Sequence, residues 1–242
     1  MSETQMPTAI VTGASSGIGL AVTQALLARD YGVVGTSRTI SKCKDLKPSK
    51  HLVLVDGDIS KKETAVKAAK AAMQNFGRID LLVNNAGIFM SKRFTDYTED
   101  DFALMINTNV ASFFYMTQQV VPQMCIQKSG HIVSISTSLV DQPIAGVPAS
   151  LPVLTKSTLS AMSRELAIEY AAEGIRVNTI SPGTVNTPMH ANDDHEALKK
   201  LAPLKRLAEV SEIVDAVLFL TSAEFVTGEN LRIDGGAHAG KW

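Results

Sequence analysis

A glycine-rich turn between an apolar strand and a helix constrains the fold of this chain more than any other feature. Thr8–Val11 is a compact apolar run typical of a buried strand. The turn Thr12–Gly19 follows at once, and Leu20–Leu27 then has helical periodicity. This order predicts a βα unit that binds a dinucleotide, because the helix N-terminus offers free amides and the positive end of its dipole to a phosphate.

Three glycines in this turn each have a physical role in such a unit. Gly13 permits a tight turn, Gly17 lets backbone amides approach a pyrophosphate, and Gly19 allows the helix to pack close to the strand. The spacing is G-x-x-x-G-x-G and not the commoner G-x-G-x-x-G, so the turn alone also fits an ordinary glycine-rich βα connection. Other features of the chain have to decide between the two interpretations.

Apolar runs and helical patterns alternate along the whole chain. Candidate strands begin near residues 8, 32, 51, 80, 130, 175 and 229, with helical patterns between most of them. This alternation predicts an α/β fold with a doubly wound, parallel, seven-stranded sheet and helices on both faces. Right-handed crossovers then place the ligand crevice at the carboxyl ends of the strands. No linker composition divides the 242 residues, so we expect a single domain over 1–242.

Composition and charge exclude several classes of function. A formal net charge of -1 gives no electrostatic case for nucleic acid, and no run of about 18 apolar residues predicts a membrane span. The polar lead 1–7 lacks the pattern of a secretory signal. Cys43 and Cys125 lie in unlike contexts, which favours free thiols and a cytoplasmic location. His190 and His195 flank an acidic stretch that we interpret as a solvated loop, so no metal site is predicted.

Further motifs follow the glycine-rich turn in a fixed order. They are Asn84-Asn85-Ala86-Gly87, Asn109, the strand His131–Ser136, Lys156, Ser181-Pro182-Gly183, Thr187 and Asp234-Gly235-Gly236. With this combination the chain resembles the short-chain dehydrogenase/reductase family, essentially from end to end. The resemblance implies a single-domain Rossmann enzyme with a nicotinamide cofactor, usually a homodimer or homotetramer. It indicates the scaffold and the cofactor far better than the small-molecule substrate.

The resemblance also implies a set of cofactor-binding residues. We expect these to be Gly13, Ser15, Ser16, Gly17, Ile18, Gly19, Ser37, Arg38, Asp58, Ile59, Asn85, Ala86, Gly87, Lys156, Pro182, Gly183 and Thr187. Asp58 is similar to the family's acceptor for the adenine amine, with Asp56 as the competing choice, and Thr187 is similar to the hydroxyl that fixes the carboxamide.

The second predicted strand indicates which nicotinamide cofactor is bound. It ends in Ser37-Arg38, with no Asp or Glu beside them. A carboxylate there would bind the ribose 2′-hydroxyl of NAD, whereas an arginine accommodates the 2′-phosphate of NADP. Guanidinium–phosphate bonding is planar and charge-assisted, so it is strong. We therefore predict NADP(H) over NAD(H); the alternative is that Arg38 is a surface cation.

The catalytic residues agree with the family only in part. In the family a serine, a tyrosine and a lysine act at the substrate carbonyl, with an asparagine behind them. Asn109 and Lys156 fit their places, but Pro152 stands at the place of the tyrosine, and no tyrosine lies within ten residues upstream of Lys156. For the serine we choose Thr137 first and Ser138 second. A hydroxyl without an activating base is a weak acid, so neither simply replaces a phenol.

A proline at 152 is compatible with folding. We predict Ser150 as the N-cap of a helix, with Leu151 and Pro152 in its first turn. Proline is tolerated in that turn because its missing amide hydrogen has no intrahelical acceptor there. The loss of the tyrosine therefore concerns acid–base catalysis and not the fold.

Three hypotheses for the function follow. The first is an NADP(H)-dependent oxidoreductase acting on an imine, an iminium or an activated alkene, which need less proton donation than a ketone. Its proton would come from Lys156, from a water near Asn109, or from Thr137 or Ser138. The second is a non-catalytic, NADP(H)-binding sensor or regulator. The third is a structural partner of a competent paralogue.

Two segments bear on the substrate and on assembly. Residues from about 186 to 204 should form a lid over the substrate, and Asp141 either serves a cationic substrate or caps its own loop. The helix after Asn109 carries an unusually apolar set of residues, namely Phe113, Phe114, Met116 and Val120. Such helices often pair between subunits in this fold, although a buried core helix has the same composition.

Overall fold

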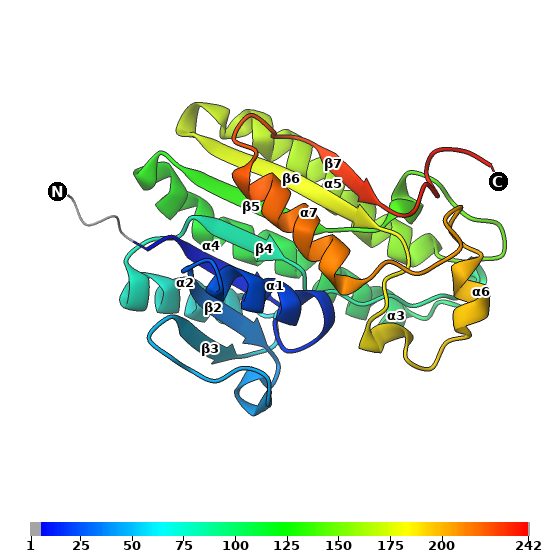
Figure 1. Ribbon diagram of the computed structural model, residues 1–242, viewed down its shortest axis with the longest axis horizontal. Coiled ribbons are helices and arrows are strands. Elements are labelled where there is room, and N and C mark those ends of the chain that lie inside the picture. Colours follow the sequence, from blue (N-terminus) through cyan, green and yellow to red (C-terminus); the bar gives the residue numbers. More distant parts are fainter. Residues whose placement is uncertain (1–5, 242) are drawn as a thin grey trace.

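Seven parallel strands form one sheet at the centre of the molecule (Figure 1). The computed structural model describes residues 6–241, so the first five residues of the predicted polar lead lie outside the described part. The strands are β1 Thr8–Thr12, β2 Gly32–Ser37, β3 Leu52–Asp56, β4 Leu81–Asn84, β5 Gly130–Ile135, β6 Ile175–Pro182 and β7 Asn230–Ile233. Each begins within one residue of its predicted start.

The strand order is β3-β2-β1-β4-β5-β6-β7, and every described pair of neighbours is parallel. The order reverses between β1 and β4, which is the switch point where α/β sheets bind ligands. The predicted doubly wound parallel sheet with helices on both faces is therefore confirmed.

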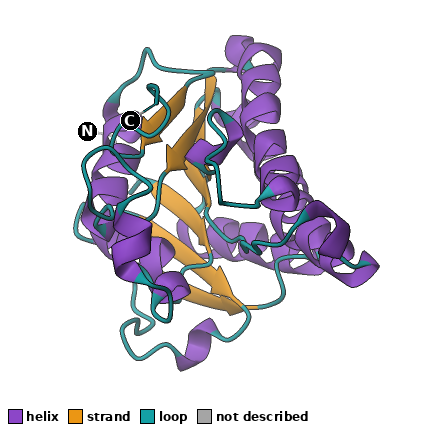
Figure 2. Ribbon diagram, turned by 90° about the vertical axis from the view of Figure 1, so that its right-hand side faces the viewer, coloured by secondary structure: helices purple, strands orange, loops and turns teal. Residues whose placement is uncertain are grey.

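Helices cover both faces of this sheet in a three-layer arrangement (Figure 2). The helices of the described residues are α1 Gly17–Leu27, α2 Lys62–Phe76, α3 Glu99–Met105, α4 Ser112–Gln127, α5 Ser150–Glu169, α6 His195–Lys199 and α7 Val210–Ser222. Short 3₁₀ turns occupy Ile40–Lys42, Phe94–Asp96, Ser138–Val140, Ala171–Glu173 and Pro188–His190, and a π-helical turn occupies Ile106–Ala111. In Figure 1, α1 and α7 lie on one face of the sheet, and α2, α4 and α5 lie on the other.

Alternation along the strands builds a separate core on each face. Ala9 and Val11 of β1 join the cluster under α1 and α7, whereas Ile10 joins the cluster under α2, α4 and α5. All three are completely buried, because a parallel sheet covered on both faces leaves no strand face in water. The continuous apolar run at the start of the chain is thus explained.

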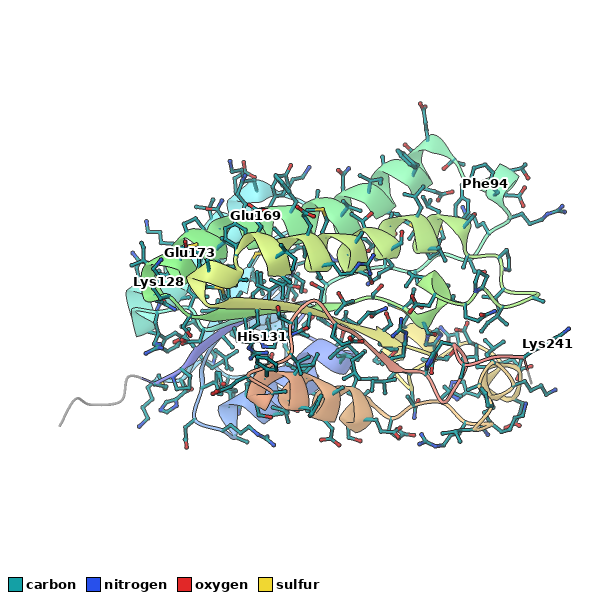
Figure 3. The ribbon with its side chains drawn as sticks, turned by 90° about the horizontal axis from the view of Figure 1, so that it is seen from above. Phe94, Lys128, His131, Glu169, Glu173 and Lys241 are labelled. Atoms are coloured by element: carbon teal, nitrogen blue, oxygen red, sulfur yellow. The ribbon has the colours of Figure 1, made fainter. Side chains whose placement is uncertain are left out.

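Polar groups at the amino ends of the strands are structural. His131, at the start of β5, is buried, and its Nε2 lies 3.0 Å from Nδ2 of Asn178. Burial lowers the pKa of His131 to about 3, so it stays neutral. Lys128 and Glu173 form an ion pair at the same end of the molecule, away from Phe94 and Lys241 (Figure 3).

Candidate active site

The glycine-rich turn has the conformation that its sequence predicts. Gly13 and Gly17 have φ values of +67° and +51°, in the left-handed region that favours glycine. A Cβ at Gly13 would lie 2.8 Å from Nδ2 of Asn85, and one at Gly19 would lie 2.3 Å from the carbonyl oxygen of Gly13. Helix α1 therefore starts directly against the end of β1, and side chains at these positions would force the two apart.

A threonine that sequence reasoning did not select joins the glycine-rich turn to the turn after β4. The Thr12 hydroxyl accepts hydrogen bonds from the backbone amides of Asn85, at 3.0 Å, and Ala86, at 2.9 Å. Nδ2 of Asn85 donates in return to the carbonyl oxygen of Thr12 at 2.9 Å. These bonds fix the two turns side by side at the carboxyl edge of the sheet, next to the switch point.

The end of β2 carries a buried hydroxyl and an exposed cation. Ser37 Oγ is buried without a hydrogen-bond partner, and the Arg38 side chain is exposed. Hydrogen bonds from Ser60 lower the pKa of Asp58, and the positive charges of Lys61 and Arg38 lower it further. Asp58 and Arg38 therefore lie near each other. Asp56 is bonded instead to the amide of Ser41 at 2.8 Å, and Ile59 is buried in the core.

Lys156 and Asn109 meet at Gly87, in the turn after β4. A Cβ at Gly87 would lie 2.8 Å from Nζ of Lys156 and 3.1 Å from Oδ1 of Asn109. Nζ of Lys156 donates to the carbonyl oxygen of Ile135 at 2.8 Å. Burial lowers the pKa of Lys156 to about 8, because the ammonium is removed from water. The site thus holds an amine that is mostly protonated at pH 7 and loses its proton more easily than an ordinary lysine.

Both amide hydrogens of Asn109 are engaged, and its amide oxygen accepts one hydrogen bond. Oδ1 accepts from the backbone amide of Ile88 at 2.8 Å, and Nδ2 donates to the carbonyl oxygen of Ile88 at 3.0 Å. Nδ2 also donates to Oγ1 of Thr155 at 3.0 Å. The residue sits in the π-helical turn Ile106–Ala111, a type of irregularity that is frequent at functional sites.

Pro152 lies in the first turn of α5, as predicted, but the predicted cap is wrong by one residue. The helix begins at Ser150, its N-cap is Ala149, and no side chain caps it. The amide of Val153 makes a helical bond to the carbonyl oxygen of Ala149 at 2.8 Å. Pro152 is buried, four residues before Lys156 on the same helix, and its ring offers no proton.

The two hydroxyl candidates after β5 differ in exposure. Ser138 is buried, whereas Thr137 is partly exposed and its Oγ1 accepts from the amide of Leu139 at 3.4 Å. Ser136, which was not selected, is buried, and its hydroxyl donates to the carbonyl oxygen of Lys156 at 3.0 Å. Thr137 is thus the more accessible of the two predicted residues.

The region after β6 closes the other side of the glycine-rich turn. Pro182 ends β6, and the amide of Gly183 donates to the carbonyl oxygen of Ile233 at 3.0 Å. A Cβ at Gly17 would lie 3.5 Å from Cγ2 of Thr187, so the predicted carboxamide-fixing residue borders the turn. The predicted lid, 186–204, contains the 3₁₀ turn Pro188–His190 and α6.

Asp141 is held by strand β7. Its Oδ2 accepts from Nδ2 of Asn230 at 2.9 Å and from Nε of Arg232 at 3.0 Å. The carboxylate therefore ties the loop after β5 to β7, and its charge is matched by a guanidinium. This geometry favours the loop-capping interpretation over a site for a cationic substrate.

Other kinds of site were sought in residues 6–241. No helix in that range has the length and hydropathy to span a membrane. That range also contains no group of three or more His, Cys, Asp or Glu side chains arranged to hold a metal ion. Cys43 and Cys125 are free thiols.

Comparison with known sequences gives full-length matches. A family model described as enoyl-(acyl carrier protein) reductase matches residues 13–238. The oxidoreductase UcpA of Escherichia coli O157:H7 is 35% identical, over 95% of this chain and 94% of that protein. A 3-oxoacyl-[acyl-carrier-protein] reductase, FabG of Buchnera aphidicola, is 32% identical over 95% of this chain and 96% of its own length.

Solved structures match over the same extent. ElxO with NADP bound superimposes with a TM-score of 0.90 at 27% identity, covering 97% of this chain and 100% of that one. The 3-ketoacyl-(acyl-carrier-protein) reductase of Brucella melitensis, complexed with NADH, gives a TM-score of 0.90 at 26% identity, covering 96% and 98% of the two chains. Nicotinamide cofactors are thus bound by proteins of this fold.

Proposed function

The chain belongs to the short-chain dehydrogenase/reductase family, and we propose that it is an NADP(H)-dependent oxidoreductase acting on a small organic substrate. The observation that carries the proposal is the convergence of the glycine-rich turn, the turn after β4 and Lys156 at one edge of the sheet. Lys156 Nζ and Asn109 Oδ1 both border Gly87, while Thr12 holds that turn against Gly13. A nicotinamide cofactor is expected for a family member, and the finer assignments below are proposals.

The residues at this edge fit a dinucleotide. Gly13 and Gly19 let α1 start directly against β1, and no side chain caps this helix start, so its first amides are available to a phosphate. Asn85–Gly87 and Lys156 lie where the nicotinamide half would be held, and Thr187 borders Gly17 on the far side. We assign Ser15, Ser16, Ile18, Pro182 and Gly183 to the same cofactor site.

We assign the 2′-phosphate of NADP(H) to the end of β2. Arg38 is exposed there, and the buried hydroxyl of Ser37 has no partner among the described residues. Hydrogen bonds from Ser60 and, to a smaller extent, the charges of Lys61 and Arg38 lower the pKa of Asp58, which keeps it ionised as the proposed acceptor for the adenine amine. Because β2 itself ends in Ser37-Arg38 and not in an Asp or Glu, we propose that NADP(H) is preferred over NAD(H).

The chemistry follows from Pro152 and Lys156. When bound, the nicotinamide supplies or accepts the hydride. Pro152 occupies the place where the family carries its acid–base tyrosine, so α5 offers no phenol one turn before Lys156. An imine, an iminium or an activated alkene demands less proton donation than a ketone, and we therefore propose these substrate classes. Lys156 is the proposed proton source, because burial brings its pKa close to working pH.

A non-catalytic NADP(H)-binding regulator is the second candidate. It is favoured by the hydrogen bonds of Asn109, because both hydrogens of its amide are engaged with Ile88 and Thr155. Under this candidate Lys156 serves only to bind the cofactor. Tight NADPH binding without hydride transfer to any acceptor is its distinguishing result.

We also propose that the chain forms a homo-oligomer. Phe114 on α4 is 53% exposed, and Leu154 and Ile168 on α5 are 46% and 80% exposed. Large apolar side chains of this kind favour burial between subunits. Sedimentation of the purified protein tests this point, with a dimer or a tetramer as the expected species and a monomer as the contrary one.

Calorimetric titration of the purified protein with NADPH and, separately, with NADH tests the proposed function. We expect micromolar binding that favours NADPH. A screen of imines and activated alkenes then follows, with Lys156→Ala as the variant expected to lose turnover. Binding of neither nucleotide contradicts both candidate functions, whereas binding without turnover of any acceptor supports the regulator.

A further inference from the structure

Thr155 connects α5 to the turn after β4 through Asn109. It precedes Lys156 on α5 and is completely buried. Its Oγ1 lies 3.1 Å from the carbonyl oxygens of both Leu151 and Pro152, so the hydroxyl donates within its own helix. The same oxygen accepts from Nδ2 of Asn109 at 3.0 Å. One hydroxyl therefore bonds α5 to the π-helical turn before α4.

Asn109 in turn forms two hydrogen bonds with the backbone of Ile88. Its two Nδ2 hydrogens go to Thr155 Oγ1 and to the Ile88 carbonyl oxygen, both at 3.0 Å, and Oδ1 accepts from the Ile88 amide at 2.8 Å. A primary amide has two donor hydrogens, so removal of the Thr155 acceptor leaves one of them unpaired in a buried site. The amide would keep its two bonds to Ile88 but lose the bond that fixes its orientation relative to α5.

We propose that Thr155 is a positioning residue that holds the turn Asn85–Ile88 in its cofactor-binding position through Asn109. The proposal rests on the proposed cofactor site, because its consequence for binding requires that this turn contact the nucleotide. The position that a Cβ would take at Gly87, next to Ile88, is bordered by Nζ of Lys156 and Oδ1 of Asn109. A shift of the Asn109 amide therefore changes one of the two groups that border the turn at Gly87.

Thr155→Val tests the proposal because valine keeps the branched shape and removes the hydroxyl. Thr155→Ser restores the hydroxyl without the methyl group. Thr158→Val is the matched control, since Thr158 Oγ1 donates to the carbonyl oxygen of Leu154 at 3.2 Å on the same helix but has no bond to Asn109. Thr155→Ala provides a second, smaller variant if valine does not fold.

Two quantities are measured on the purified wild type and variants, namely backbone hydrogen exchange and NADPH affinity. Hydrogen exchange of the backbone amides 85–90, without cofactor, is expected to be about tenfold faster in Thr155→Val than in wild type. The reason is that the loss of one buried hydrogen bond typically shifts a local opening equilibrium by about this factor. NADPH affinity by calorimetry is expected to fall by about five- to tenfold. Thr155→Ser should match wild type in both readouts, and Thr158→Val should leave both unchanged.

A purely structural role for Thr155 would lower the melting temperature and leave the affinity of the folded protein for NADPH unchanged. Wild-type exchange at 85–90 in both Thr155→Val and Thr155→Ala would overturn the proposal. So would an effect of Thr158→Val as large as that of Thr155→Val. If wild type binds neither NADPH nor NADH, the proposed function fails, but the exchange experiment still decides whether Thr155 positions the turn.

Discussion

Nζ of Lys156 donates a 2.8 Å hydrogen bond to the backbone carbonyl oxygen of Ile135, at the end of β5. Only 8% of the lysine is exposed, and burial lowers its pKa to about 8 from an unfolded value near 10.4. Between these two values the unfolded chain binds more protons than the folded one, so the free energy of unfolding contributed by Lys156 rises with pH. Below pH 8 both states are protonated and the contribution is constant.

Lys156→Met should therefore remove a pH dependence. We expect the stability of wild type, relative to this variant, to increase between about pH 8 and pH 10 and to stay level from pH 6 to pH 8. Urea denaturation of both proteins across this range measures the difference. A relative stability that is flat throughout, or that falls above pH 8, would contradict a buried lysine with a lowered pKa.

Gly13→Ala should disrupt cofactor binding, whereas Gly77→Ala should not. Both glycines have positive φ, +67° and +74°, so alanine strains each backbone by about 1–2 kcal/mol. An added Cβ at Gly13 meets Nδ2 of Asn85 at 2.8 Å and Cα of Ala86 at 3.0 Å, but one at Gly77 meets nothing within 4 Å. Chemical denaturation of the two variants measures the backbone strain that they share, and NADPH titration measures the effect of the clash at Gly13. Equal NADPH affinities of the two variants would refute the proposed placement of the cofactor at Gly13.

Arg38→Ala should weaken NADPH binding selectively. A charge-assisted hydrogen bond to phosphate contributes about 1.5–3 kcal/mol, so we expect a loss of about 10- to 100-fold for NADPH and little change for NADH. Lys44→Ala is the control, because Lys44 is an exposed cation on the segment after β2 without an assigned role. Equal weakening of both nucleotides by Arg38→Ala would make Arg38 a non-specific surface cation.

Pro152→Tyr should give the chain the ability to reduce a simple ketone. A residue at 152 lies one helical turn before Lys156, and a neighbouring ammonium lowers the pKa of a phenol. General acid catalysis contributes about 10²- to 10⁴-fold, which sets the expected gain in kcat/KM with NADPH. Pro152→Phe supplies the ring without the hydroxyl. If the two variants bind NADPH and are equally inactive, the loop after β5 does not present a ketone to this position.

Asp141→Asn should leave activity and NADPH affinity unchanged. The carboxylate is bonded to Arg232 and Asn230, and its side chain and that of Arg232 are 32% and 34% exposed. Ion pairs with this exposure contribute up to about 1 kcal/mol, so only a small loss of stability is expected. Urea denaturation and steady-state kinetics check both points, and a marked rise in KM for a cationic substrate would restore Asp141 to the substrate site.

The sequence by itself determined where along the chain the strands begin and that they form a parallel sheet. Parallel strands that are buried on both faces leave continuous apolar runs, which is why β1, β4 and β5 could be located to within a residue. It also located the candidate cofactor site, since Gly13, Asn85 and Thr187 follow strands whose carboxyl ends share one edge. These features can be recognised from short stretches of sequence, because each motif directly follows its strand. The parallel arrangement of the strands then places the motifs at one edge of the sheet.

Only the tertiary structure decided which side chains meet. The Thr12 hydroxyl accepts hydrogen bonds from amides more than 70 residues away. Thr155 on α5 is bonded directly to Asn109 in the π-helical turn, and Asp141 is paired with Arg232. The structure also shows that the N-cap of α5 is Ala149 and not the predicted Ser150. Such contacts depend on how helices pack on the sheet to within an ångström, because hydrogen bonds fail beyond about 3.5 Å. Hydrophobic periodicity fixes which face of a helix is buried, but not that distance.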